Sequence, residues 1–219
     1  MGFEVIVEIE PPPAAELDTV REQIAVLRRV ADAFLVPDSH LGRATVSSVA
    51  VAHEVGYLGG RAIACLNARD RNVLGLRRDL LTAAAYGVRE LLFVYGDAPT
   101  VGDRSALTVR EMLRQIHQHP PPGPTLSIAV AADVRRPLPD WKRPADALYV
   151  QVGAAAEAIE RWRAEHAIDH PIHAGVELAI AQVEELRASG AVDGVHLVPA
   201  RRYREVAVEL ALRGLASSP

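Results

Sequence analysis

Apolar and polar residues alternate strictly near the start of the chain, over Phe3–Glu10. Successive side chains of a strand point to opposite faces, so this alternation places Glu4, Glu8 and Glu10 together on one face. Prolines at positions 11–13 end the strand. A face of carboxylates is typical of a solvated edge strand. The alternative is that these glutamates bind or react with a ligand.

The stretch 61–99 contains a complete strand–helix–strand unit. A short apolar run at Ala62–Leu66 is followed by a polar turn, and apolar residues then return at helical spacing over Val73–Ala85. Gly87 is placed to end that helix, and a second apolar run follows at Leu91–Tyr95. This order predicts two parallel strands, each with a polar loop at its carboxyl end.

The same pattern runs through the rest of the chain. Further strands are predicted at Phe3–Glu10, Ala33–Pro37, Leu126–Ala131, Ala147–Val152, Pro171–Val176 and Val192–Val198. Helices are predicted at Ala14–Ala31, Val46–Tyr57 with Thr45 as its cap, Ala106–His117, Ala154–Ile168, Leu178–Ser189 and Arg201–Leu212. The segment Asp133–Pro144 is rich in proline and leaves space for one helical turn. Eight such repeats predict an α/β fold: a single (β/α)8 TIM barrel domain over residues 1–219, with short loops and a degenerate fifth helix.

Polar side chains follow most of the predicted strands at their carboxyl ends. These ends meet at one mouth of a parallel barrel, so we expect the side chains to surround a common ligand. The set comprises Glu8, Glu10, Asp38, Asn67, the segment Arg69–Asn72, Asp97, Gln151, Arg201 and Arg202.

Composition and charge narrow the classes of function. The net charge is −4, and no apolar run reaches the ~18 residues of a membrane span, so neither a nucleic acid nor a membrane is predicted as a partner. The hydrophobic fraction of 49% is ordinary for a globular protein, and the first residues lack the basic segment of a signal peptide. We therefore expect a cytoplasmic protein. Cys65 is the single cysteine, and its apolar strand favours a packed thiol over a nucleophile.

The histidines do not predict a metal site. His166, His170 and His173 are interrupted by Pro171 between a helix end and a strand, so they do not share a face. His196, within the eighth predicted strand, is interpreted as a hydrogen-bonded barrel residue and not as a base.

The polar turns carry a resemblance to a known family. Its motifs are Arg69-Asp70-Arg71-Asn72, Asp79-Leu80-Leu81 with Ala83-Ala84-Ala85, Gly87, and Gly96-Asp97. In order and spacing they resemble the methylenetetrahydrofolate reductase family. The first strand of that family has a glutamate separated by two residues from a double proline, which is the position of Glu8 before Pro11. Asp146, Gln151, Gly175, His196 and Arg202 extend the resemblance over nearly the whole chain.

The resemblance implies a flavin oxidoreductase of one-carbon metabolism. In the family, FAD at the barrel mouth takes a hydride from NAD(P)H and passes it to the folate 5,10-methylenetetrahydrofolate, giving 5-methyltetrahydrofolate. Glu8 would be the general acid that opens the methylene bridge, and Asp97 would tune the flavin and the pterin. Gln151 and Arg202, with Glu10 nearby, would contact the folate or the nicotinamide. The flavin is expected to lie against Asp38, Asn67, Arg69, Asp70, Asn72, Gly96 and Asp97.

The chain also departs from the family. Cys65 and Asn67 replace a histidine and a threonine, and the segment 133–137 replaces one that holds part of the flavin. Arg135 and Lys142 are cations that suit a diphosphate there. Two alternatives stay open: a non-catalytic folate- or flavin-binding barrel, alone or as a subunit of a complex, and a flavin-independent pterin reductase. The oligomeric state is open as well, a homo-oligomer included.

Overall fold

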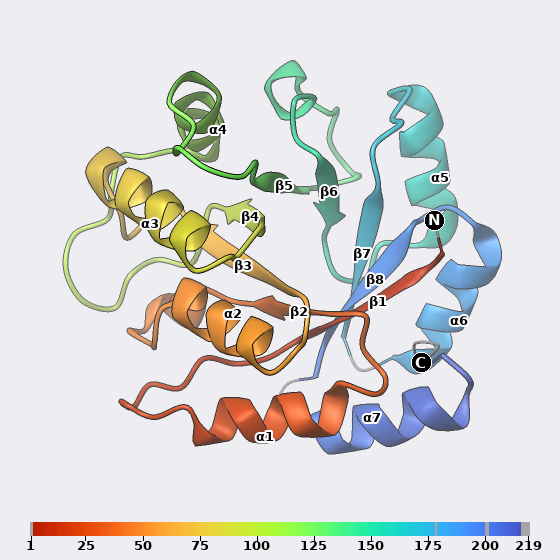
Figure 1. Cartoon of the computed structure of the whole chain (residues 1–219). Helices are drawn as coiled ribbons and strands as arrows, with labels where there is room; N and C mark the ends of the chain where they lie inside the picture. Colours follow the sequence, from red (N-terminus) through yellow and green to blue (C-terminus); the bar gives the residue numbers. More distant parts are fainter. Residues whose placement is uncertain (1, 178, 200–201, 216–219) are drawn as a thin grey trace.

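A closed parallel barrel forms the centre of the molecule. A computed structural model describes residues 2–177, 179–199 and 202–215. Each strand pairs with the next, and β8 (Gly194–Val198) pairs with β1 (Glu4–Glu8), so the predicted TIM barrel is confirmed (Figure 1). The other strands are β2 (Ala33–Val36), β3 (Ala62–Asn67), β4 (Glu90–Val94), β5 (Ser127–Ala132), β6 (Ala147–Val150) and β7 (Ile172–Glu177).

Helices surround the barrel on its outside, with α1 beside α7 (Figure 1). They are α1 (Asp18–Leu27), α2 (Ser48–Tyr57), α3 (Val73–Ala85), α4 (Val109–Gln118), α5 (Ala156–Glu165), α6 (Ile180–Ser189) and α7 (Tyr203–Leu212). The bounds of α3 agree with the prediction at both ends. Across the described residues, no helix combines the length and the apolar character that a bilayer span requires.

Every helix except α3 begins two to four residues later than predicted, and the contacts at the starts of α1 and α2 show why. The Glu16 carboxylate accepts hydrogen bonds from the backbone N–H groups of Asp18 and Thr19, at 2.6 and 3.2 Å, so α1 begins at Asp18. The predicted cap Thr45 was wrong. Its hydroxyl donates to the Val46 carbonyl oxygen at 3.3 Å, and α2 begins two residues later.

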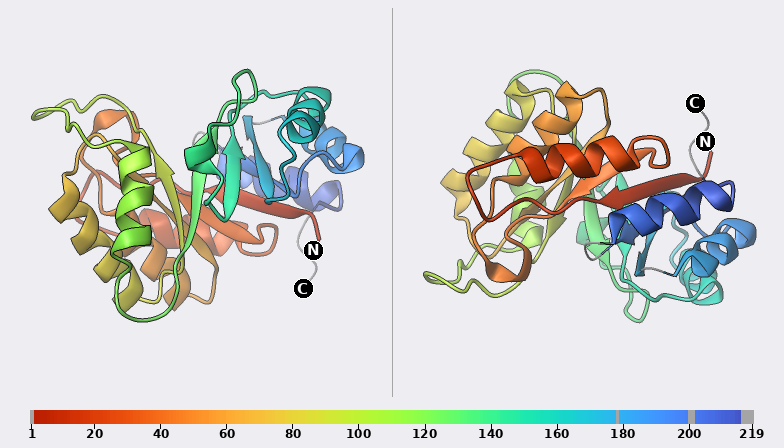
Figure 2. Two further views of the ribbon diagram at one scale, coloured as in Figure 1. Left: turned by 90° about the horizontal axis from the view of Figure 1, so that it is seen from above. Right: turned by 90° about the horizontal axis from the view of Figure 1, so that it is seen from below.

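The fifth repeat lacks a long helix, as predicted. Only a short 3-10 turn, Asp140–Lys142, lies between β5 and β6, where the chain crosses as a loop (Figure 2). The Trp162 indole N–H of α5 donates to the Arg136 carbonyl oxygen at 2.8 Å and so ties this loop to the neighbouring helix. Proline keeps the segment from forming a longer helix.

Alternate residues of each strand face outward and inward. Outward residues such as Val5 and Val7 pack beneath the helices in the main core. The inward residues fill the lumen with a separate apolar cluster. Its members are Ile6, Ala33, Leu35, Ile63, Cys65, Leu92, Ala129 and Tyr149. We call the carboxyl end of the lumen the mouth and its amino end the floor.

Candidate functional site

The glutamate face of β1 lines the lumen. Ile6 belongs to the inner cluster, so Glu4 and Glu8, two residues away on either side, face inward at the floor and at the mouth. The solvated edge strand, the alternative to a functional Glu8, is excluded, because a closed barrel has no edge. The alternation along β1 therefore places one carboxylate at each end of the lumen, Glu4 at the floor and Glu8 at the mouth.

Glu8 contacts a histidine across the β1–β8 pair. The Glu8 Oε2 atom lies 3.2 Å from Nε2 of His196, and both side chains are only about one-sixth exposed, at 17% and 16%. His196 was predicted to be a hydrogen-bonded barrel residue, and this is confirmed. A sheltered carboxyl group beside an imidazole, open toward the mouth, can exchange a proton with a bound ligand.

Gln151 directly follows β6 at the same end of the barrel. Its Oε1 atom accepts a hydrogen bond from the Val134 backbone N–H at 3.2 Å and so joins the loops that follow β5 and β6. Its amide NH2 group makes no hydrogen bond to the described residues. Two donors at the mouth are therefore available for a ligand.

Glu177 is a mouth residue that the sequence analysis missed. It is the last residue of β7, opposite Val198 of β8, and it shares the inward face with His173. Its exposed carboxylate has no hydrogen bond or ion pair with the chain as far as the structure describes it. The predicted strand ended one residue earlier, although alternation through Gly175 could have identified it.

Asp97 lies beyond β4, with its carboxylate turned toward the loop after β2. Its Oδ2 atom accepts a hydrogen bond from the backbone N–H of Leu41 at 2.9 Å. Leu41 and Ser39 both have positive φ, 56° and 50°, which is uncommon for residues other than glycine. Asp97 therefore anchors a strained turn at the rim of the barrel.

Asn67 organises the loops after β2 and β3 from a buried position. Its Nδ2 atom donates to Asp38 Oδ2 at 3.1 Å and to Asp70 Oδ2 at 2.8 Å, while its Oδ1 atom accepts from the Arg69 and Asp70 backbone N–H groups. Gly96 packs against it, since a Cβ atom there would meet Asn67 Cβ at 2.6 Å, and Gly96 has a φ of 76°.

Arg71 completes this network. Its guanidinium contacts Asp38 at 2.7 Å and Asp79 at 3.2 Å, and it also donates to the Asn67 carbonyl oxygen. Burial raises the pKa of Asp38, and the Arg71 charge acts against that shift. Burial also raises the pKa of the Cys65 thiol well above its ordinary value, with Glu8 and Asp38 adding to the effect. Cys65 is therefore a packed thiol, as predicted.

The remaining residues of the Arg69–Asn72 segment have separate positions. Asn72 caps α3, its Oδ1 atom accepting from the Gly75 backbone N–H at 2.9 Å. The Nε atom of Arg69 is buried without a hydrogen-bond partner among the described residues. Arg69 is thus the member of this segment whose side chain is not used by the loop network.

The cations predicted near a diphosphate are engaged within the protein. Arg135 pairs with Asp133 at 2.9 Å on the surface, which lowers the pKa of Asp133 to about 2. Lys142 donates from Nζ to the Ala131 carbonyl oxygen at 2.6 Å, and burial lowers its pKa. Both side chains brace the loop between β5 and β6.

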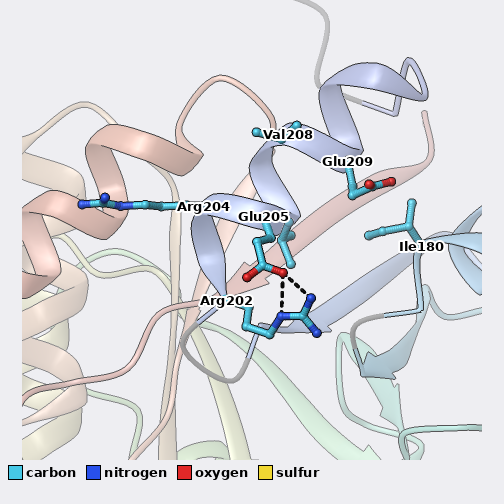
Figure 3. A pocket seen from close by; sticks show the side chains of 7 residues that line it. Ile180, Arg202, Arg204, Glu205, Val208 and Glu209 are labelled. Atoms are coloured by element: carbon cyan, nitrogen blue, oxygen red, sulfur yellow. Dashed lines mark hydrogen bonds and ion pairs between the residues drawn. The ribbon is translucent and has the colours of Figure 1, made fainter.

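Arg202 and Glu10 make contacts with helices α7 and α1. The Arg202 Nε atom donates to Glu205 at 2.7 Å within a groove of about 410 Å³ between the start of α6 and the outer face of α7 (Figure 3). The Glu10 backbone N–H donates to Gln23 of α1 at 3.1 Å. Arg201, beside Arg202, falls outside the described residues.

The floor carries a second cluster that was not predicted. Glu4 contacts Nε2 of His173 at 3.0 Å and Arg61 at 2.8 Å, and Arg61 also contacts Glu90 at 2.9 Å. The hydrogen bond from His173 lowers the pKa of Glu4, with Arg61 acting in the same direction against burial. Tyr149 stacks on His173 with ring centres 4.9 Å apart, inside the lumen.

The structure therefore separates the predicted site into groups. Glu8 and Gln151 face the mouth together with His196 and Glu177. Asp97 and Arg202 lie at the same end of the barrel, but their charged groups contact Leu41 and Glu205. Among the residues assigned to a flavin by resemblance, four contact one another and a fifth, Asn72, caps α3; the four are Asp38, Asn67, Asp70 and Gly96.

Comparisons with known proteins support the fold. No family model and no curated protein matches the sequence. Tryptophan synthase from M. tuberculosis is similar in structure, with a TM-score of 0.64 at 18% identity over 99% of this chain and 94% of that one. The aldolase QR15 has a TM-score of 0.61 at 12% identity, covering 97% and 96% of the two chains.

A third solved structure is similar at comparable identity. It is an uncharacterized protein from Clostridium thermocellum, described as binding two copies of 5-methyl-5,6,7,8-tetrahydrofolic acid. Its TM-score is 0.67 at 12% identity, and the match covers 98% of this chain and 96% of that chain. Identities this low establish a shared barrel and nothing finer.

Proposed function

We propose that the protein is a methylenetetrahydrofolate reductase-like oxidoreductase that binds a reduced folate at the barrel mouth. In this proposal a hydride from NAD(P)H converts 5,10-methylenetetrahydrofolate to 5-methyltetrahydrofolate. The observation that carries the proposal is the sheltered Glu8 carboxyl group beside His196, at the end of the barrel where this fold places its reactive groups. The folate bound by the similar barrel from Clostridium thermocellum supports the same class of ligand.

The chemistry needs an acid at the position that Glu8 occupies. Opening the methylene bridge breaks a carbon–nitrogen bond, and the departing amine nitrogen must take up a proton. Glu8 would donate that proton from Oε2 or Oε1, and the resulting iminium carbon would accept the hydride. General acids of this kind typically accelerate a reaction by ~10²–10⁴-fold.

Two further groups at the mouth suit the polar edge of a pterin. The free amide NH2 of Gln151 can donate to the ring carbonyl and nitrogen acceptors. The unpaired Glu177 carboxylate can accept two parallel N–H groups, because its two oxygens match such a pair of donors. These assignments orient the pterin across the mouth with its methylene group toward Glu8.

The flavin has less support from the geometry than the folate. Of the side chains expected around FAD, Asn67 bonds to Asp38 and Asp70. Arg135 is paired with Asp133, and Lys142 with a backbone carbonyl. The described residues do not form an open cradle for a diphosphate, so the proposed reaction has no step through a flavin. This arrangement favours direct hydride transfer from the nicotinamide, the flavin-independent form of the reductase.

The deciding experiment measures binding and turnover separately. Purified protein is titrated calorimetrically with 5-methyltetrahydrofolate and is assayed for oxidation of NADH and NADPH in the presence of 5,10-methylenetetrahydrofolate. Gln151→Leu should weaken folate binding, and Gln118→Leu on the outside of α4 is the matched control. Folate binding without nicotinamide oxidation would establish the non-catalytic binding barrel. If the protein neither binds folate nor oxidises the nicotinamide, the folate proposal is wrong.

A second measurement addresses the cofactor. The protein is incubated with FAD, separated from free flavin, and its visible spectrum and melting temperature are recorded. A ligand that binds only the folded state raises the melting temperature by mass action. A retained flavin spectrum with a higher melting temperature would restore the flavin reductase, and their absence together with turnover would establish the direct reaction.

A further inference from the structure

We infer that His196 is a positioning residue for Glu8: it holds the carboxyl group in the lumen and returns its proton after each turnover. The inference deepens the proposed function and rests on it. It begins from the 3.2 Å contact between Glu8 Oε2 and His196 Nε2, which joins two side chains that are largely shielded from water.

The barrel confines the His196 ring. On β8, His196 lies opposite Ile6 of β1 and Gly175 of β7, so Glu8 extends from the next inward position of the neighbouring strand. Gly175 presents no side chain on the inward face beside the imidazole. Tyr149 lies across the lumen with its ring centre 6.1 Å from that of His196. A Cβ atom at Gly175 would meet Val152 Cγ2 at 2.9 Å, so Val152 packs closely over this position.

The other titratable groups near the Glu8–His196 pair are either neutral or turned away from it. Tyr149 of β6 and Cys65 of β3 are kept neutral because burial raises their pKa values. His173 of β7 is turned to Glu4 at the floor, and Glu177 is exposed at the rim. No lysine or arginine among the described residues contacts Glu8.

The proton balance follows from this geometry. In the reaction the Glu8 O–H bond breaks and an N–H bond forms on the departing amine. The protonated His196 then passes the proton on Nε2 to the Glu8 carboxylate and becomes neutral. Because the His196 side chain is 16% exposed, water at the mouth can protonate it again. An imidazole is suited to this role since it can hold a proton on either ring nitrogen.

The test is chemical rescue of turnover by free imidazole. His196→Ala should lower kcat by about 10²-fold, the lower end of general acid–base contributions, and added imidazole should restore roughly tenfold of that loss. His196→Gln should be equally slow but not rescued, because its side chain fills the space that imidazole needs. His173→Ala removes the corresponding ring at the floor and is the matched control, with kcat unchanged and insensitive to imidazole.

The outcomes separate this inference from the proposed function. Circular dichroism melts first establish that each variant is folded. Wild-type protein that binds no folate and oxidises no nicotinamide would end the proposed function and the inference with it. Wild-type turnover with an unaffected His196→Ala variant, or with a slow variant that imidazole does not rescue, would overturn the inference alone.

Discussion

The two ends of the barrel lumen contain the same pair of side chains in different surroundings. At the mouth, Glu8 lies 3.2 Å from His196, and at the floor Glu4 lies 3.0 Å from His173. Each histidine contacts its glutamate through Nε2, His196 from the neighbouring strand and His173 from two strands away. The local contacts of the two pairs are therefore alike, and their functions must be distinguished by what else touches them.

An arginine makes the difference. Arg61 bridges Glu4 and Glu90 at 2.8 and 2.9 Å, so the floor carboxylate is fixed in its charged form by two partners. The lowered pKa of Glu4 is the electrostatic consequence. Glu8 has no such cation among the described residues. An ion pair with an arginine suits a structural role, whereas a carboxyl group with a histidine alone can give its proton away.

The largest expected effect is on turnover. Glu8→Gln should slow the reduction of methylenetetrahydrofolate by ~10²–10⁴-fold, because the amide cannot protonate the departing amine. Glu4→Gln, the same change at the floor, should leave kcat within about twofold, since groups at the amino end of such barrels serve stability and not chemistry. Steady-state kinetics of both folded variants provides the comparison. Equal losses would mean that the mouth and the floor act as one unit.

The next effect concerns an arginine that fixes charge at the mouth. Arg71 pairs with Asp38 as Arg61 pairs with Glu4, but in a more buried position, with side chains 10% and 8% exposed. Here burial outweighs the arginine charge and the pKa of Asp38 is raised. Arg71→Met should lower the free energy of unfolding by about 3–5 kcal/mol, because it leaves Asp38 buried without its partner. Denaturant unfolding is the measurement. Arg78→Met, which replaces an α3 side chain that is 75% exposed, should change the free energy of unfolding by less than about 1 kcal/mol.

A stable Arg71→Met variant would contradict this account of the loops after β2 and β3. The substitution would remove the arginine partner of Asp38 and Asp70, while their hydrogen bonds to Asn67 remain. Flavin binding by that variant, absent in the wild-type protein, would be direct evidence that the network competes with a cofactor.

The sequence predicts the barrel well and its polar contacts poorly, for a physical reason. Strands and helices follow from the spacing of apolar residues within one segment, and so α3 and the degenerate fifth helix were identified. The partner of Glu4 lies 169 positions away at His173, and no local pattern encodes that pairing. The same holds for Glu8 and His196. The hydrogen bond between Asn67 and Asp38 also could not be predicted, because it depends on how two loops meet.

A smaller effect should appear as a pH dependence of stability from the floor. The pKa of Glu4 is lower in the folded protein than its ordinary value of 4.5, so the unfolded chain binds this proton more tightly. The stabilisation is therefore present above that value and is lost as the pH falls through it toward the lowered folded-state pKa. The Glu4 side chain is 36% exposed, so we expect only about 0.5–1.5 kcal/mol.

Thermal unfolding between pH 3 and pH 7, an interval chosen to span roughly the ordinary carboxylate titration, measures this term. Glu4→Gln should flatten the acidic part of the profile. Glu184 lies on the surface of α6 and pairs with Arg213. Glu184→Gln should leave the shape of the pH profile unchanged. A profile that Glu4→Gln does not alter would mean that the floor network contributes nothing specific to acid stability.

The smallest effect tests whether the two ends are insulated from each other. Tyr149 lies between them, 4.9 Å from the His173 ring and 6.1 Å from the His196 ring, and its hydroxyl makes no hydrogen bond to the described residues. Tyr149→Phe removes only that hydroxyl, so the free energy of unfolding should change by less than about 1 kcal/mol. The acid stability set by Glu4 and the turnover set by Glu8 should both persist. If the hydroxyl instead carried protons between the histidines, turnover would fall in this variant while its stability remained, and the two His–Glu pairs would have to be treated as one connected site.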